Sequence, residues 1–335
     1  MAPPLRAAWF GVGSMGEAIL GSLPFLHATP EFPLLLGALA KQRKLNPFLV
    51  EKDYWLMHCL WGLQQQGWKF ELKGGASLSK GHQLIQRFSE DIDVRFIPPA
   101  ALKVKAGKNH DKPAHQASRL YFFDWLAAQI SMPGLLTVER LTEFDDAKHR
   151  NAGIRLIYPV TAGDLPGLKD GILLEVGFDD TQPNTPCTIS SWALDAALHA
   201  NMPVIDNRAV GVACYSPAYT FVEKLQTVST KFRLQQEATH FPKNFLRHYH
   251  DLYCLLGSPE VQAFIGTPTY QARKVERFRT GDNLDIAGNE AFLLSDPAVR
   301  TLYTTKYRET AALYYAGQVP FPAILERIAQ HLKRL

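Results

Sequence analysis

A glycine-containing turn near residue 74 has the composition of a phosphate-binding site. Phe70–Lys73 reads as a short strand, and Gly74 and Gly75 follow it, where glycine permits unusual backbone angles and a close ligand approach. Ser77 offers a hydroxyl group, and the helix expected to begin here presents free backbone N–H groups to an anion. Lys80, within that helix, could add positive charge for a triphosphate or could only extend along the surface.

Two aspartates follow a short distance along the chain. Ser89–Ile97 alternates polar and apolar residues, so Asp91 and Asp93 point to one face of a strand and the intervening apolar side chains enter a core. Two carboxylates about 7 Å apart on one strand repel each other. A divalent cation such as Mg²⁺ would relieve that repulsion and use the oxygens as ligands; two solvated acids are the alternative. A sequence that has the glycine turn, the serine hydroxyl and the paired aspartates in this order arises by chance less often than any one of these features alone.

The string from Lys73 to Asp93 resembles the active-site signature of DNA polymerase β-like nucleotidyltransferases, and more narrowly that of the AbiEii/AbiGii nucleotidyltransferase toxin family. Four further segments carry the likeness: Val50–Tyr54, Leu174–Val176, Glu223–Leu225 and Arg247–Tyr253. Together they span about residues 45–256. Ala76 departs from the pattern, because family members often have threonine at this position.

The resemblance implies a set of active-site residues. Asp91, Asp93 and Glu175 would hold Mg²⁺, Lys224 would contact the nucleotide phosphates, and Asp251 would orient Lys224 or the acceptor. The residues expected to bind the NTP are Gly74, Gly75, Ser77, Lys80 and Lys224.

Three of these side chains also have ordinary structural interpretations. Glu175 is the only acid within an apolar run and could form a salt bridge with Arg155 of the adjoining strand. Lys224 lies beside the apolar stripe of its helix and could be a surface lysine. Asp251 could pair with Arg247, four residues earlier on the same helix.

The elements that would position these residues indicate an α+β (mixed α/β) fold. Helices and strands alternate in the first part of the chain, and helices dominate the rest. We predict an uncertain N-terminal extension (1–30), a polymerase β-like α/β nucleotidyltransferase domain (31–210) and a mostly helical domain (211–335). The predicted helices include 76–87, 116–131, 217–236, 242–256 and 320–333, and further strands lie near 134–142, 152–160 and 171–178.

The N-terminal extension contains a second glycine motif. Gly11-Val-Gly-Ser-Met-Gly16 fits the G-x-G-x-x-G pattern of dinucleotide-binding folds. Pro24 would end the following helix early, and no second strand that ends in a ribose-binding acid follows at the expected spacing. We therefore do not expect a dinucleotide site.

The charge distribution suggests where an acceptor could bind. The chain has 36 lysines and arginines against 32 aspartates and glutamates, a net charge of +4. Residues 103–119 contain five cations and one acid, so the net charge of this segment equals the net charge of the whole chain. It is either a solvated loop or a strip that contacts phosphates; its cations are Lys103, Lys105, Lys108, Lys112 and Arg119.

These observations favour a Mg²⁺-dependent enzyme that transfers a nucleoside monophosphate from an NTP to an acceptor. The resemblance implies the toxin of a toxin–antitoxin or phage-defence pair, with a cognate antitoxin as partner and tRNA as acceptor. The alternative enzymatic function is nucleotidylation of a protein or small molecule. The alternative non-enzymatic function is that of a nucleotide- or RNA-binding module whose transfer activity has decayed. The four cysteines show no metal-ligand spacing and no apolar run approaches the ~20 residues of a membrane span, so we expect a cytoplasmic protein with reduced thiols and no membrane association.

Overall fold

The computed structural model describes residues 23–163, 170–238, 241–242 and 245–335. The Gly11–Gly16 motif lies outside the described residues, as does most of the predicted N-terminal extension. The described end of that extension packs onto the protein, since Leu26 is fully buried and His27 contacts Tyr54.

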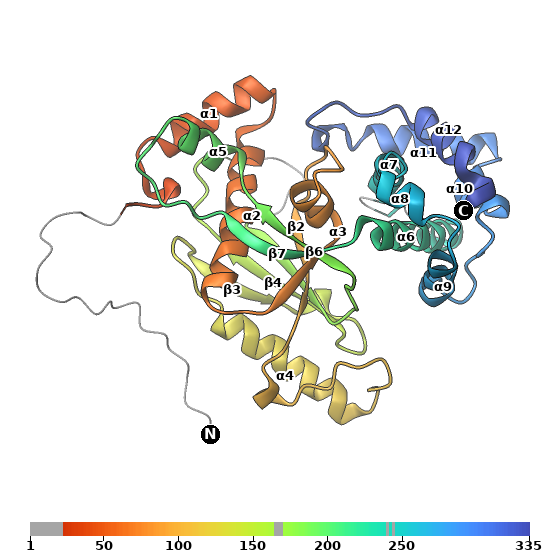
Figure 1. Cartoon of the computed structure of the whole chain (residues 1–335), viewed down its shortest axis with the longest axis horizontal. Helices are drawn as coiled ribbons and strands as arrows, with labels where there is room; N and C mark the ends of the chain where they lie inside the picture. The colour runs from red at the N-terminus through yellow and green to blue at the C-terminus, as the bar shows by residue number, and fades with distance from the viewer. Residues whose placement is uncertain (1–22, 164–169, 239–240, 243–244) are drawn as a thin grey trace, which may run out of the picture.

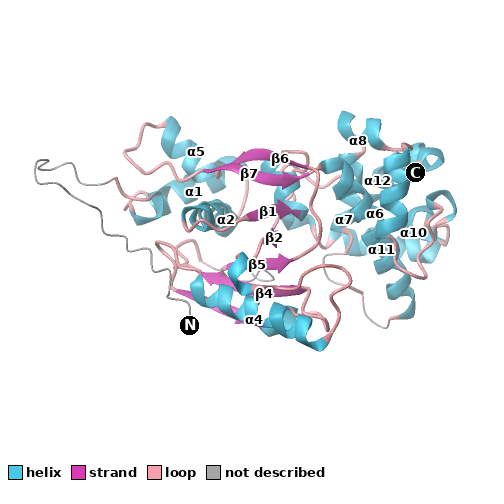
Figure 2. Ribbon diagram, turned by 60° about the horizontal axis from the view of Figure 1, so that its bottom comes forward, coloured by secondary structure: helices cyan, strands magenta, loops and turns pink. Residues whose placement is uncertain are grey.

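A seven-stranded mixed sheet forms the first part of the molecule (Figure 2). Its strands lie in the order β3-β4-β5-β2-β1-β7-β6. The β1/β7 and β2/β5 pairs are parallel, and the other neighbours are antiparallel. The bounds are β1 (Phe70–Lys73), β2 (Asp91–Phe96), β3 (Thr137–Leu141), β4 (Asn151–Ile157), β5 (Ile172–Gly177), β6 (Asn184–Ile189) and β7 (Ala209–Tyr215).

The two faces of the sheet differ in character because its strands alternate as predicted. Ile92, Val94 and Phe96 of β2 are buried, whereas the side chains between them are only half-buried. The buried face joins a hydrophobic cluster with side chains from four helices, and the other face carries Asp91 and Asp93. Those helices are α1 (Phe32–Arg43), α2 (Pro47–Gln65), α4 (Pro113–Gln129) and α5 (Trp192–His199). Asn46 caps α2, since its Oδ1 accepts from the N–H of Phe48 at 2.8 Å.

Helices form the rest of the molecule, beside the sheet (Figure 1). They are α6 (Pro217–Glu237), α7 (Arg247–Leu255), α8 (Pro259–Phe264), α9 (Pro268–Arg277), α10 (Glu290–Leu293), α11 (Pro297–Arg308) and α12 (Phe321–His331). These helices share a second hydrophobic cluster, which also includes Leu78 and Ile85 from the first part of the chain. The mixed α/β class is confirmed. The division predicted between residues 210 and 211 falls inside β7, because the last strand of the sheet continues to Tyr215.

The segment between β1 and β2 differs from the sequence prediction. A short helical turn, α3 (Gly74–Ala76), continues as a π-helical turn that ends at Gly81, so the predicted helix 76–87 is wrong beyond that residue. Gln83 has a φ of 54°, in the left-handed region that no α-helix continues through. The N–H of Phe88 then bonds to the carbonyl of Leu313 at 2.7 Å. Contacts with the distant C-terminal part, rather than local propensity, therefore shape residues 82–90.

Two further predictions concern the state of the cysteines and the absence of membrane-spanning segments. All four cysteines are free thiols, two of them buried. Within the described parts of the chain, every helix is too short or too polar to cross a membrane.

Candidate active site

Two acidic side chains meet where β2 and β5 run side by side. Asp93 is the direct partner of Glu175 in the parallel register of these strands, so neighbouring strands bring the two carboxyl groups to the same polar face. A cavity of about 50 Å³ lies at this point. Its lining includes both acids together with Lys73, Asn151 and Phe144. The sequence prediction that Asp93 and Glu175 come together is therefore met in the fold.

The protonation of Glu175 reflects this crowding. Burial, followed by the negative charges of Asp93 and Asp91 and a hydrogen bond with Asp93, raises the pKa of Glu175 to about 8. The carboxyl group of Glu175 therefore keeps its proton to a higher pH than a solvent-exposed glutamate does. The alternative salt bridge is not formed, because Arg155 lies opposite Leu173 in the strand register and no ion pair joins it to Glu175 among the described residues.

The glycines at the end of β1 are required by the packing of the site itself. Gly74 has a φ of +69°, and a Cβ there would lie 2.0 Å from Asp93 Oδ2. A Cβ on Gly75 would lie 2.5 Å from Ser89 Oγ. Both positions therefore exclude larger residues before any ligand is considered.

Two residues predicted to bind the NTP, Ser77 and Lys80, have protein partners in the structure. Ser77 is fully buried, and its hydroxyl donates to the carbonyl of Tyr215 at 3.4 Å. Lys80 forms an ion pair with the buried carboxylate of Asp53 at 2.5 Å and lies over the ring of Trp192. This ion pair gives Lys80 a structural role, because a buried carboxylate needs its counterion, and its phosphate contact stays a prediction.

A buried ion network lies on the helical side. Asp251 of α7 is fully buried and accepts two hydrogen bonds from Arg87, from Nε at 2.6 Å and from Nη2 at 2.8 Å. Lys224 of α6 lies 3.0 Å from the same carboxylate. Burial alone would raise the pKa of Asp251, but the charges of Arg87 and Lys224 outweigh it and hold the pKa well below its usual range. Lys224 and Asp251 are thus together as predicted, and the pairing of Asp251 with Arg247 is replaced by one with Arg87.

Two cations that the sequence reasoning missed complete this side. Lys231 lies on α6 and Arg247 begins α7. Burial, and then the positive charges of Arg247 and Lys224, lower the pKa of Lys231 to about 8. In the described part of the chain no carboxylate is within ion-pair distance of Lys231 or Arg247. The ionised form of Glu175 interacts electrostatically with both cations, which places them near the acids of the sheet. The seven-residue spacing from Lys224 to Lys231, two helical turns, was the available sequence signal.

The basic segment 103–119 needs one correction. Arg119 is fully buried, and its guanidinium donates to the carbonyls of Lys105, His110 and Lys148. It holds the loop together and is not part of a surface strip. The four lysines of the segment are exposed, and Lys108 forms an ion pair with Glu276 of α9.

Comparison with known proteins identifies the family. The model of the AbiEii nucleotidyl transferase toxins of type IV toxin–antitoxin systems matches residues 56–327, and the chain belongs to this family. It is accordingly a nucleotidyltransferase and a toxin of the type IV class, for which the family implies an NTP substrate and an antitoxin partner. A comparison with curated proteins found no match.

Two solved structures are similar to the chain at low identity. MenT4, a nucleotidyltransferase toxin from Mycobacterium tuberculosis H37Rv, is 13% identical with a TM-score of 0.40, over 89% of this chain and 94% of that one. An antigenic nucleotidyltransferase-like protein from Paracoccidioides brasiliensis is 15% identical with a TM-score of 0.34, over 68% of this chain and 94% of that one.

Proposed function

We propose that this protein transfers a nucleoside monophosphate from an NTP to tRNA, with Mg²⁺ bound by acids of the sheet and pyrophosphate as the leaving group. One observation carries the proposal. Glu175 and its neighbour Asp93 lie near Lys231 and Arg247, two cations that form no ion pair with a carboxylate among the described residues. Clustered acids placed opposite clustered cations suit a magnesium–triphosphate complex.

The donor atoms fit Mg²⁺, although the side chains would have to adjust. Asp91, Asp93 and Glu175 supply carboxylate oxygens from two adjacent strands, the donors that this ion prefers. Among the described residues, no three ligating side chains already form a group that could hold a metal ion. When bound, Mg²⁺ would supply Lewis-acid stabilisation of the phosphate charge. Glu175 must first release its proton, which gives metal binding a dependence on pH.

The cations on α6 and α7 would bind and orient the triphosphate. Lys224, Lys231 and Arg247 come from two packed helices, which fixes their spacing before the substrate arrives. Asp251 would position Lys224, and Arg87 would in turn hold Asp251 through its two hydrogen bonds. Asp251 is fully buried, so it acts through Lys224 and does not touch the substrate.

The proposal of an RNA acceptor is supported by exposed positive charge. Lys103, Lys105 and Lys112 are exposed on one loop. The buried guanidinium of Arg119 stabilises this loop through hydrogen bonds to its backbone carbonyls. Such lysines contact phosphates without reading bases, and contacts of this kind weaken as salt rises.

The direct test is incubation of the purified protein and Mg²⁺ with each labelled NTP, in parallel with tRNA, other RNA, or lysate protein and metabolites. We expect label in tRNA, and none with the Asp91→Asn variant. Label in protein or in a small molecule would replace tRNA with that acceptor. NTP binding without transfer to any fraction would favour a decayed module and refute the proposal.

The acceptor surface has its own test. Replacement of Lys103, Lys105 and Lys112 by serine should raise the KM for tRNA and flatten its dependence on salt, with the affinity for NTP unchanged. A control variant, Lys41→Ser, removes an exposed lysine from α1, distant in sequence from the loop. Equal salt dependence in the triple variant and the parent would show that the loop is only solvated.

A further inference from the structure

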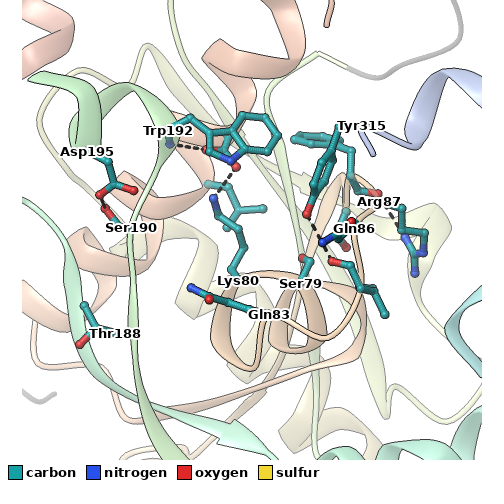
Figure 3. A pocket seen from close by; sticks show the side chains of 15 residues that line it. Ser79, Lys80, Gln83, Gln86, Arg87, Thr188, Ser190, Trp192, Asp195 and Tyr315 are labelled. Atoms are coloured by element: carbon teal, nitrogen blue, oxygen red, sulfur yellow. Dashed lines mark hydrogen bonds and ion pairs between the residues drawn. The ribbon is translucent and has the colours of Figure 1, made fainter. Parts of the chain in front are cut away.

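A second and larger cavity lies apart from Asp93 and Glu175, and Arg87 of the buried ion network forms part of its lining. Its volume is about 300 Å³, at the lower end for small-molecule sites. The lining comes from α2, from residues 79–89, from the end of β6 with the start of α5, and from Tyr315 near the C-terminus. Figure 3 shows Thr188 and Ser190 across the cavity from Gln86 and Arg87.

Each charged side chain of the lining already has a partner. Lys80 pairs with Asp53 at 2.5 Å, and Arg87 pairs with Asp251 at 2.6 Å. Asp195 accepts a hydrogen bond from the hydroxyl of Ser190 at 2.5 Å. A phosphate would find no unpaired cation here, whereas a neutral polar group could bind without breaking an ion pair.

The rest of the lining combines aromatic rings with flexible donors and acceptors. The rings of Trp192 and Tyr315 meet edge to face, with centroids 5.1 Å apart. Gln83, Gln86 and Thr188 are exposed side chains at its border, each able both to donate and to accept a hydrogen bond. Lys80 and Arg43 lie over the ring of Trp192, so this ring contributes its edge and Tyr315 the second aromatic surface. Aromatic groups beside adaptable amides and hydroxyls suit the base and the ribose of one nucleoside.

The cavity shares a wall with the proposed catalytic centre. Ser89 lines the cavity and packs against Gly75, whose neighbour Gly74 packs against Asp93. From these two contacts and the standard backbone geometry, Ser89 Oγ lies within about 11 Å of Asp93 Oδ2. The cavity and the acids are therefore neighbours, separated by the packed backbone of Gly74 and Gly75.

We propose that this cavity binds a nucleoside of the transfer reaction, either that of the incoming NTP or the terminal nucleoside of the acceptor RNA. The inference rests on the proposed function for the identity of the ligand. It adds a binding site that is separate from the triphosphate contacts of α6 and α7.

The test is to fill the cavity from its edge. Thr188 is an exposed residue of the edge strand β6, where tryptophan suits the strand conformation, so T188W should occupy the cavity and leave the fold intact. T185W is the matched control, since Thr185 is also exposed on β6 but lies outside the lining. Melting temperatures of both variants and the parent establish equal folding. Should T188W melt lower than T185W, Q86L changes only an exposed amide of the lining and replaces it in every assay.

Two measurements separate the sources of the nucleoside. The first is the Kd for ATP, GTP, CTP and UTP without RNA, and the second is the KM for RNA with and without its last nucleotide. If the NTP supplies the nucleoside, T188W should weaken NTP binding about tenfold or more. If the acceptor supplies it, NTP binding should be unchanged, the KM for complete RNA should rise about tenfold, and the two RNAs should become equivalent.

The results that overturn each idea differ. Identical Kd and KM values for T188W and T185W would refute a nucleoside in this cavity, even if the parent labels tRNA. Conversely, a parent that labels no RNA contradicts the proposed acceptor, while the NTP affinities of the two variants still decide whether the cavity binds a nucleoside.

Discussion

Replacing Glu175 by glutamine should stabilise the metal-free protein at alkaline pH. The pKa of this carboxyl is raised from 4.5 to about 8 in the folded state, so the folded protein binds its proton more tightly than the unfolded chain does. At a pH below 4.5 both states hold the proton and the site costs nothing. As the pH rises from 4.5 to about 8, the unfolded chain alone releases its proton, and stability falls. Each pKa unit is worth about 1.4 kcal/mol, so the penalty reaches at most about 5 kcal/mol.

The assay is thermal unfolding of the parent and Glu175→Gln in chelator, from about pH 5 to about pH 9. The two proteins should melt alike at the acidic end, and the variant should melt higher at the alkaline end, by an amount on the order of 10 °C. The difference between the two proteins cancels the titrating groups that do not interact with Glu175. Lys231, whose lowered pKa acts in the opposite direction, is coupled to Glu175 and cancels only in part. Glu139→Gln is the control, because Glu139 is exposed on a strand of the same sheet.

Addition of Mg²⁺ completes the test. The ion should stabilise the parent more at about pH 8.5 than at about pH 6, because the carboxyl of Glu175 must lose its proton to bind. It should stabilise Glu175→Gln little at either pH. Parent and Glu175→Gln curves that remain parallel over the whole pH range would refute the raised pKa, and with it the crowding of acids on which the metal proposal rests.

Three further predictions concern the network around this site. Asp93→Asn should lower transfer about a hundredfold or more without lowering the melting temperature of the metal-free protein; substantial remaining activity would contradict a metal ligand at this position. Asp251→Asn should destabilise the protein by about 3–5 kcal/mol in denaturant unfolding, because Arg87 would remain buried without its carboxylate; unchanged stability would show that the pair is unimportant. Lys231→Gln should raise the KM for NTP about tenfold with no loss of stability, since it relieves like-charge repulsion, and a lower melting temperature with unchanged kinetics would indicate a structural lysine.

Local patterns predicted the parts of this fold that depend on neighbours in the sequence. The alternation of Ser89–Ile97 is enough to place Asp91 and Asp93 on the face opposite the core, because the side-chain period of a strand is fixed by its backbone. Asn46 followed by proline likewise marks the start of α2, since a cap satisfies the first free N–H groups of a helix.

Long-range charge pairs were beyond the reach of the sequence. Arg87 and Asp251 are 164 positions apart, and no spacing rule connects them. Arg119 counts as a surface cation by composition, yet its guanidinium donates its hydrogen bonds to backbone carbonyls inside a loop. Lys80 has the position of a phosphate ligand in its motif but pairs with Asp53 on another helix. In each case the partner of a buried charge is set by tertiary packing, which a periodic pattern does not encode.

The positions of Leu78 and Ile85 limit how segments of such chains can be exchanged by recombination or by protein engineering. These two residues belong to the hydrophobic cluster of the C-terminal helices, although they precede β2. A C-terminal half exchanged between relatives, or expressed alone from residue 216 onward, would lose two core side chains and would leave Asp251 buried without Arg87. The unit that can be exchanged between relatives is therefore discontinuous: residues 77–90 must accompany the helices, and a crossover point placed between the sheet and the helical part would divide a single core.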